Sequence, residues 1–130
     1  MPTLQDGEMV IFVTTGKIKS GDVVAFRYNN QVLIKRVIAV AGDLIDISED
    51  GTVYINGVER VEPYINEKSL GECDIVFPVQ VPDSQYFVMG DFRRVSLDSR
   101  SDTIGMVRRD RMIGKALLRI WPLTRLGPIR

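Results

Sequence analysis

The stretch that decides how we interpret the fold is "QVLIKRVIAV", residues 31–40, a run of mostly β-branched and aliphatic side chains. Side chains of a β-strand alternate between its two faces. One face would then carry Leu33, Lys35, Val37 and Ala39, and the other would carry Ile34, Arg36, Ile38 and Val40. We therefore expect a strand with apolar side chains on both faces and one cation on each.

Further short runs of this kind lie along the chain, separated by Gly, Asn and Asp. They are "MVIFVTT" (9–15), "DVVAFRY" (22–28), "LIDI" (44–47), "TVYI" (52–55), "QYFVMG" (85–90) and "MIGKALLRIWPL" (112–123). Such spacing is typical of antiparallel β-structure, and helical periodicity is weak throughout. The predicted fold class is mostly β, an antiparallel sheet or barrel-like domain.

Two turn signals and a proline-rich stretch predict an insert between the strands. Asp50-Gly51 and Asn56-Gly57 are dipeptides that tolerate positive φ at hairpin tips. Residues 62–82, which hold three prolines, predict a long or mobile loop. No repeat or linker divides the chain, so we interpret residues 1–130 as a single domain with a hairpin and loop insert at 45–85.

The composition excludes several classes of protein and of site. The chain is 45% hydrophobic, and 17 Lys+Arg balance 17 Asp+Glu, so neither disorder nor nucleic-acid binding is favoured. The single cysteine, Cys73, cannot form an internal disulfide, and no Cys/His cluster suggests a metal ion. We expect no cofactor. Because the chain has no histidine, a hydrolase would need another general base.

Lys35 is the evident candidate for that base. Two adjacent cations on this strand cannot both avoid apolar neighbours, and a desolvated lysine can lose its proton whereas an arginine stays charged. Full burial lowers the pKa of a lysine by roughly 3 to 5 units. The alternative is a lysine at a sheet edge, whose stem covers apolar surface while its ammonium group stays in water.

A cluster of charges and hydroxyls, "GDFRRVSLDSR" at residues 90–100, directly follows an apolar run. It holds two aspartates, three arginines and two serines. Taken alone, it is typical of a solvated turn whose ion pairs contribute roughly 0 to 1 kcal/mol each.

Three segments together resemble the extracytoplasmic catalytic domain of bacterial type I signal peptidases. The family pattern Ser-Met-x-Pro-Thr-Leu is similar to "MPTL" at the start of the chain, and a strand ending in Lys-Arg is similar to "LIKRVIAVAGD". The pattern Gly-Asp-Asn-Arg-x-x-Ser-x-Asp-Ser-Arg is similar to "GDFRRVSLDSR". The phrases "GDVVAF", "YINGV" and "EPYI" also fit, so the resemblance covers nearly the whole chain.

The resemblance implies a serine endopeptidase with a Ser-Lys dyad, in which a lysine amine deprotonates the serine nucleophile. By position, Lys35 matches the general base and Ser96 matches the serine that orients it. The charged frame of the site is matched by Asp91, Arg93, Asp98 and Arg100, of which Asp98 and Arg100 resemble a structural ion pair. Ser99 would neighbour that pair and not the site.

The family resemblance also implies a substrate and a setting. The substrates would be signal peptides of secreted preproteins, cut after a small-x-small motif that two shallow apolar pockets read. Residues matched to those pockets are Met1, Pro2, Leu4, Val10, Leu33 and Ile34, although Val10 is equally suited to strand core. The domain would lie on the extracytoplasmic face of the plasma membrane, anchored by an N-terminal transmembrane segment, with an apolar rim including Trp121 resting on lipid.

The chain departs from the family pattern at several positions. When Pro2-Thr3-Leu4 is matched to the pattern, the catalytic serine falls two residues before Met1, so the 130 residues as given are expected to be inactive. Phe92 and Val95 replace asparagines, which puts the hydrogen bonds of those asparagines in doubt. Ala41 replaces a proline in a Gly-Asp turn.

Other readings of the sequence remain. A non-catalytic signal-peptidase-like scaffold or chaperone for secreted protein assembly would explain the absent serine, but an idle buried amine would cost stability. A self-cleaving repressor-type Ser-Lys protease would need its own scissile Ala-Gly bond, and "AVAGD" lies beside the base strand instead of in a flexible arm. A generic β-barrel binding module would not need Lys35, Ser96 and the Asp/Arg frame together.

Overall fold

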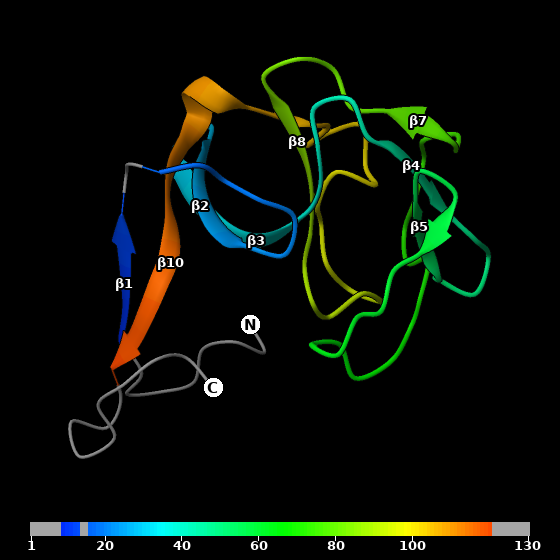
Figure 1. The fold of residues 1–130 in the computed structure, drawn as a ribbon, viewed down its shortest axis with the longest axis horizontal. Helices are drawn as coiled ribbons and strands as arrows, with labels where there is room; N and C mark the ends of the chain where they lie inside the picture. The colour runs from blue at the N-terminus through cyan, green and yellow to red at the C-terminus, as the bar shows by residue number, and fades with distance from the viewer. Residues whose placement is uncertain (1–8, 14–15, 121–130) are drawn as a thin grey trace.

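The computed structural model describes residues 9–13 and 16–120. In this part of the chain the strands form two antiparallel sheets, which we call the large sheet and the small sheet (Figure 1). The large sheet has the order β1 (Met9–Val13), β10 (Met112–Ile120), β2 (Val23–Tyr28), β3 (Gln31–Val40), β8 (Gln85–Met89) and β9 (Val107–Arg108). The small sheet has the order β6 (Val58–Glu59), β5 (Val53–Ile55), β4 (Leu44–Ile47) and β7 (Val79–Gln80).

The predicted antiparallel β fold is confirmed, and the two sheets do not close into a barrel across the described residues. Each strand expected from an apolar run is present. The strands β7 and β9 and the short 3-10 helix η1 (Arg109–Arg111) were not predicted. Each of these strands is two residues long, and two residues are too few for a period-2 pattern to register.

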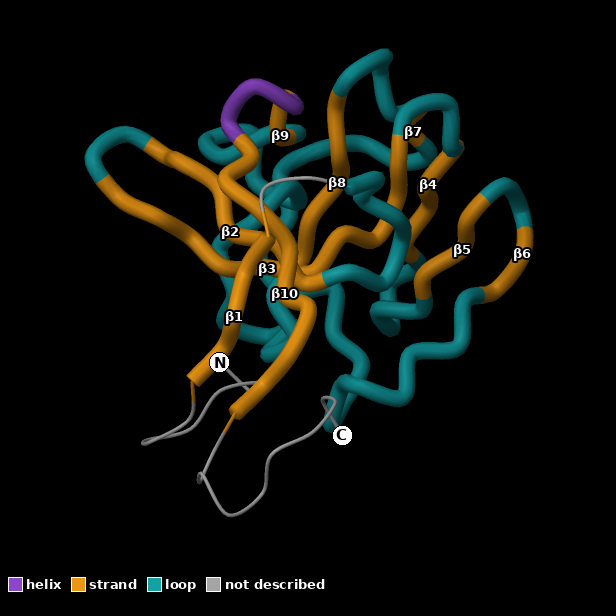
Figure 2. The backbone as a smooth tube through the Cα atoms, turned by 60° about the vertical axis from the view of Figure 1, so that its left-hand side comes forward, coloured by secondary structure: helices purple, strands orange, loops and turns teal. Residues whose placement is uncertain are grey.

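The hairpin insert forms where its turn dipeptides predict. Gly51 (φ 91°) lies in the turn between β4 and β5, and Asn56 (φ 53°) with Gly57 (φ 83°) closes the two-residue turn between β5 and β6. The Asn56 side chain also accepts a hydrogen bond from the backbone N–H of Leu44 at 2.8 Å, which ties the tip to β4. Figure 2 shows this hairpin on the side of the molecule away from the β1–β10 pair.

The core lies on both faces of the central strands β3 and β8. One cluster joins the large sheet to the small sheet and consists of Ile38, Ala39, Ile45, Ile47, Val53, Val81, Phe87 and Met89. The second packs on the large sheet and consists of Val24, Phe26, Val37, Tyr86, Val88 and Val107. Complete burial of one such side chain contributes about 1.5 to 3 kcal/mol.

The simple alternation expected for residues 31–40 is wrong at its C-terminal end. The pairing of β3 with β8 shifts between Val37 and Ala39, so a β-bulge interrupts the period. Ala39 therefore joins Ile38 in the first cluster, and Val40 packs against the cluster of Val37. Lys35 and Arg36 lie before the bulge and keep opposite faces.

No helix among the described residues is both long and apolar enough to cross a lipid bilayer.

Candidate active site

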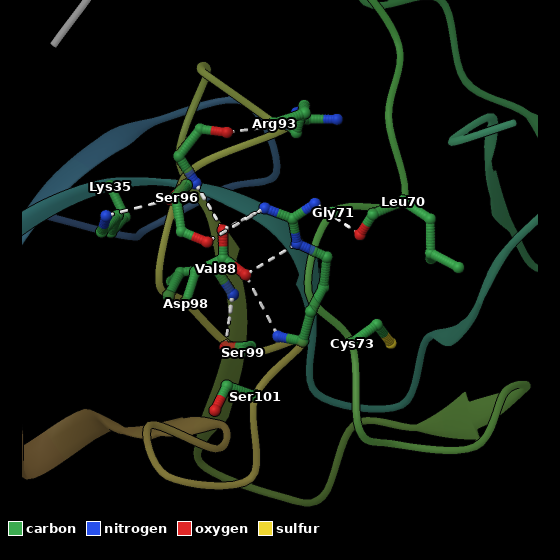
Figure 3. A network of polar contacts seen from close by, with 12 residues as sticks. Lys35, Leu70, Gly71, Cys73, Val88, Arg93, Ser96, Asp98, Ser99 and Ser101 are labelled. Atoms are coloured by element: carbon green, nitrogen blue, oxygen red, sulfur yellow. Dashed lines mark hydrogen bonds and ion pairs between the residues drawn. The ribbon is translucent and has the colours of Figure 1, made fainter. Parts of the chain in front are cut away.

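Lys35 of β3 and Ser96 of the loop after β8 meet in the structure. The Lys35 amine, from the middle of β3, donates a hydrogen bond to the Ser96 hydroxyl at 3.0 Å (Figure 3). Both side chains are partly buried. Burial lowers the pKa of Lys35 below its ordinary 10.5, the charge of Asp98 opposes that effect, and the charge of Arg100 adds to it. An amine with a lowered pKa is more readily neutral near physiological pH, which a general base requires.

Gly90 makes this contact sterically possible. A Cβ atom at Gly90 would lie 2.0 Å from the Ser96 hydroxyl oxygen, 2.6 Å from the Ser96 Cβ and 3.4 Å from the Lys35 amine. Real Cβ atoms essentially never approach other heavy atoms as closely as the two distances to Ser96, whereas 3.4 Å to the Lys35 amine is ordinary van der Waals contact. Gly90, directly after β8, therefore forms the wall of the site, where only a hydrogen atom fits.

The turn that carries Ser96 closes through its backbone. The N–H groups of Val95 and Ser96 both donate to the carbonyl of Phe92, at 3.2 and 3.0 Å. The side chains of Phe92 and Val95, which depart from the family pattern, are 48% and 75% exposed. They border a surface hollow of about 300 Å³ beside the loop. The turn thus forms without asparagine side chains at these two positions.

Ala41, the third departure, also leaves its turn intact. The N–H of Asp43 donates to the carbonyl of Val40 at 3.0 Å, and the N–H of Val40 donates to the Asp43 carboxylate at 3.0 Å. Gly42 supplies the positive φ of 90° that the turn requires. Alanine precedes that glycine at a position where proline is common but not necessary.

Asp98 and Arg100 form a fully buried ion pair beneath the site. The Asp98 carboxylate accepts from Arg100 Nε and Nη2, both at 2.9 Å, and both side chains are 0% exposed. It also accepts from the backbone N–H groups of Arg100 at 3.1 Å and Gly90 at 2.9 Å. The remaining Arg100 nitrogen donates to the carbonyl of Leu70 at 2.8 Å (Figure 3). Asp98 therefore holds one side of Gly90 directly.

Asp91 and Arg93 belong to a second buried network. Asp91 accepts from Arg36 Nε and Nη2 at 3.0 and 2.9 Å. Arg93 donates through both terminal nitrogens to Glu62, at 2.8 and 2.7 Å, and these two side chains are 0% and 3% exposed. The Arg36 guanidinium carbon lies 3.9 Å from the centre of the Tyr64 ring.

The sequence analysis does not predict the contacts that Arg36, Glu62 and Tyr64 make in this network. Glu62 and Tyr64 stand in "EPYI", a phrase that supports the family resemblance but does not by itself indicate a buried contact. The signal that could have found them is charge balance. Arg93 and Arg100 are both buried, and each buried cation requires an anionic partner. Ser99 lies next to Asp98 and bonds to β8, because its hydroxyl accepts a hydrogen bond from the N–H of Val88 at 3.0 Å.

The structure addresses only some of the predicted pocket residues. Leu33 packs on the second core cluster, and Ile34 is partly buried in β3. Val10 pairs with Arg119 across β1 and β10. Met1, Pro2, Leu4 and Trp121 lie outside the described residues, as does the side chain of Val10. In the part of the chain that the structure describes, no three His, Cys, Asp or Glu side chains gather where they could hold a metal ion.

The comparison with known proteins explains why these motifs occur together. The family model described as signal peptidase, peptidase S26, matches residues 1–121. The chain belongs to this family. Two of the motifs that carry the resemblance lie on β3 and on the loop after β8, and the third, "MPTL", lies outside the described residues.

Relatives in the signal peptidase family match most of the chain. Signal peptidase IB of Staphylococcus aureus (strain N315) is 37% identical over 143 residues, which cover 95% of this chain and 73% of the relative. Signal peptidase I T of Bacillus subtilis (strain 168) is 34% identical, with 96% and 70% covered. The crystal structure of a signal peptidase I from Enterococcus faecalis V583 is similar with a TM-score of 0.62 and 30% identity, and covers 77% of this chain and 97% of that one.

Proposed function

We propose that this chain is the catalytic domain of a serine endopeptidase that removes N-terminal signal peptides from secreted preproteins. The single observation that carries the proposal is the 3.0 Å contact between the Lys35 amine and the Ser96 hydroxyl in a chain without histidine. Family membership supports it, since the relatives named above are signal peptidases.

In this proposal Lys35 is the general base and Ser96 orients it. The nucleophile is a serine two positions before Met1. The neutral Lys35 amine takes the proton of that serine as its oxygen attacks the scissile carbonyl, and then gives the proton to the departing amine. Water attacks the resulting ester with the same lysine as base. The Ser96 hydroxyl, held beside Gly90, directs the lysine nitrogen throughout.

The substrate would bind as an extended strand near the segment that carries Leu33 and Ile34. Main-chain pairing tolerates varied sequences, and pockets for alternate side chains select small residues before the cut. The proposed pocket residues remain Met1, Pro2, Leu4, Val10, Leu33 and Ile34. The domain would act on the extracytoplasmic face of the membrane, next to lipid.

The test compares two extended chains that differ in one atom. One carries Ser-Met ahead of Met1 and the other carries Ala-Met, and both are assayed on a preprotein peptide with a small-x-small site. We expect cleavage only by the first, with a rate that rises with pH because only neutral Lys35 accepts a proton. Lys35→Ala in the first chain should abolish cleavage while the fold persists.

Two results would refute the proposal. Comparable cleavage by both extended chains would mean that the nucleophile is elsewhere, and turnover by the Lys35→Ala variant would mean that the base is another group. Peptide binding without cleavage in the Ser-Met chain would instead support the scaffold alternative.

A further inference from the structure

Tyr64 contacts both arginines of the second network, the partly buried Arg36 and the buried Arg93. Its ring centre is 3.9 Å from the Arg36 guanidinium carbon and 5.9 Å from that of Arg93. Its hydroxyl donates to Glu62 Oε2 at 2.8 Å. Burial and then the charge of Glu62 raise the pKa of Tyr64, so the phenol keeps the proton that it donates. One side chain thus contacts a cation through its face and an anion through its hydroxyl.

This network also contacts Gly90, at its carbonyl oxygen, whereas Asp98 contacts the N–H of the same residue. Arg93, held by both oxygens of Glu62, donates through Nε to the carbonyl of Gly90 at 2.9 Å. The N–H of Gly90 donates to Asp98 at 2.9 Å. Gly90 is therefore fixed at its nitrogen by one buried ion pair and at its oxygen by the other.

The position of Gly90 controls the contact between Lys35 and Ser96. The Ser96 hydroxyl already lies where a Cβ atom of residue 90 would be, so a small displacement of the glycine changes the space available to it. The same network holds the next residue, because Arg36 binds Asp91 through two hydrogen bonds and also donates to the carbonyl of Gly21 at 2.9 Å. Movement at Glu62 or Tyr64 would thus be transmitted to the loop and to β3 together.

We propose that Glu62 and Tyr64 are positioning residues, which hold the Gly90–Ser96 loop against Lys35 through Arg93 and Arg36. They come from the irregular segment between β6 and β7, visible as the long loop in Figure 2. The sequence predicts a long or mobile loop here, and its contacts with Arg93 and Arg100 anchor this segment to the site. That these residues affect catalysis rests on the proposed function, whereas their holding the loop against Lys35 does not.

The test measures Lys35 itself and needs no nucleophile. In the 130-residue chain with 13C-labelled lysine, the Cε signal of Lys35 is assigned with a Lys35→Arg variant and titrated against pH. The charged groups that act on Lys35 are Asp98 and Arg100, on the loop after β8, and the variants leave both unchanged. The variants are Glu62→Gln, Tyr64→Leu, and Tyr64→Phe, which keeps the ring over Arg36. Glu67→Gln is the matched control, because Glu67 lies in the same segment, is 66% exposed and contacts the loop only through an exposed pair with Arg94 at 3.9 Å.

We expect the Lys35 midpoint to rise toward the ordinary lysine value in Glu62→Gln and Tyr64→Leu, because a loosened loop admits water to the amine. Tyr64→Phe should cause a smaller rise and Glu67→Gln none. In the Ser-Met extended chain, Glu62→Gln and Tyr64→Leu should lower kcat about ten- to hundred-fold with little change in KM, as expected for a misplaced catalytic group.

A lowered melting temperature with an unchanged Lys35 midpoint and kcat would overturn the inference, since the segment would then be only an anchor. If Tyr64→Leu does not fold, Glu62→Gln and Tyr64→Phe decide the matter by the same criteria. Failure of the proposed function is recognised separately: cleavage by the Lys35→Ala variant would refute the base, yet would leave the titration result for Glu62 and Tyr64 standing.

Discussion

Replacing Gly90 with alanine should separate Lys35 from Ser96. The new Cβ would lie 2.0 Å from the Ser96 oxygen and 2.6 Å from its Cβ, whereas unstrained carbon contacts lie at about 3.5 to 4.0 Å. Ser96 must therefore move by about 1 Å or more, which breaks a hydrogen bond that is now 3.0 Å long. Overpacking of this kind costs about 1 to 3 kcal/mol. For a chain of this size that loss lowers the melting temperature by roughly 3 to 12 °C.

The assay for Gly90→Ala is a double-mutant cycle with Ser96→Gly. The φ angle of Gly90 is not among the positive ones, so alanine is acceptable to the backbone and the penalty is steric. Gly90→Ala should lower the melting temperature and abolish cleavage by the Ser-Met extended chain. In the Ser96→Gly background, which removes both clashing atoms, the same change should cost much less. An equal cost in both backgrounds, or an unchanged melting temperature in the first, would refute the steric argument.

Two further predictions concern the same loop. Asp98→Ala strands the fully buried Arg100 charge, so it should cost about 3 to 5 kcal/mol in urea unfolding and lower activity as well. A variant that unfolds like the parent but does not cleave would place Asp98 in the chemistry instead. Phe92→Asn and Val95→Asn should each change unfolding by no more than about 0.5 kcal/mol, because both side chains are exposed and the turn closes through its backbone. A larger loss in urea titrations would mean that these side chains hold the loop.

The parts of the fold that the sequence predicts are those with a repeated local signal. The long strands β2, β3 and β8 carry apolar runs, and Asn56-Gly57 has the backbone freedom that its hairpin turn needs. The bulge in β3 has no such signal, because Ala39 and Val40 suit either face equally well. Only their packing against β8 and the small sheet decides which face each takes.

The candidate site likewise contains residues that the sequence predicts and residues that it does not. Lys35 and the Gly90–Arg100 loop stand out because charges interrupt or follow apolar runs, and the family pattern assigns them roles. Glu62 and Tyr64 lie about 30 residues before the loop that they contact, and the pairing of Glu62 with Arg93 is a tertiary event. A local pattern can indicate that a buried arginine needs a carboxylate, but it cannot say which of 17 acidic residues supplies it.

Lys35 should destabilise the fold at neutral pH, and the size of that effect should depend on pH in a definite direction. Its pKa is lowered in the folded chain, so below that pKa it is protonated in both states and the fold bears the full cost of a partly buried ammonium group. Between the folded pKa and the ordinary 10.5, the unfolded chain binds more protons, and stability rises with pH. Lys35→Met has similar length and no titrating proton, so its stability advantage over the parent should be largest below the folded pKa of Lys35 and shrink toward pH 10.5. Urea unfolding of both chains at several pH values measures this difference and cancels every other titrating group. A difference that does not change with pH would mean that the Lys35 amine is solvated in the folded chain, and it could not then serve as the base.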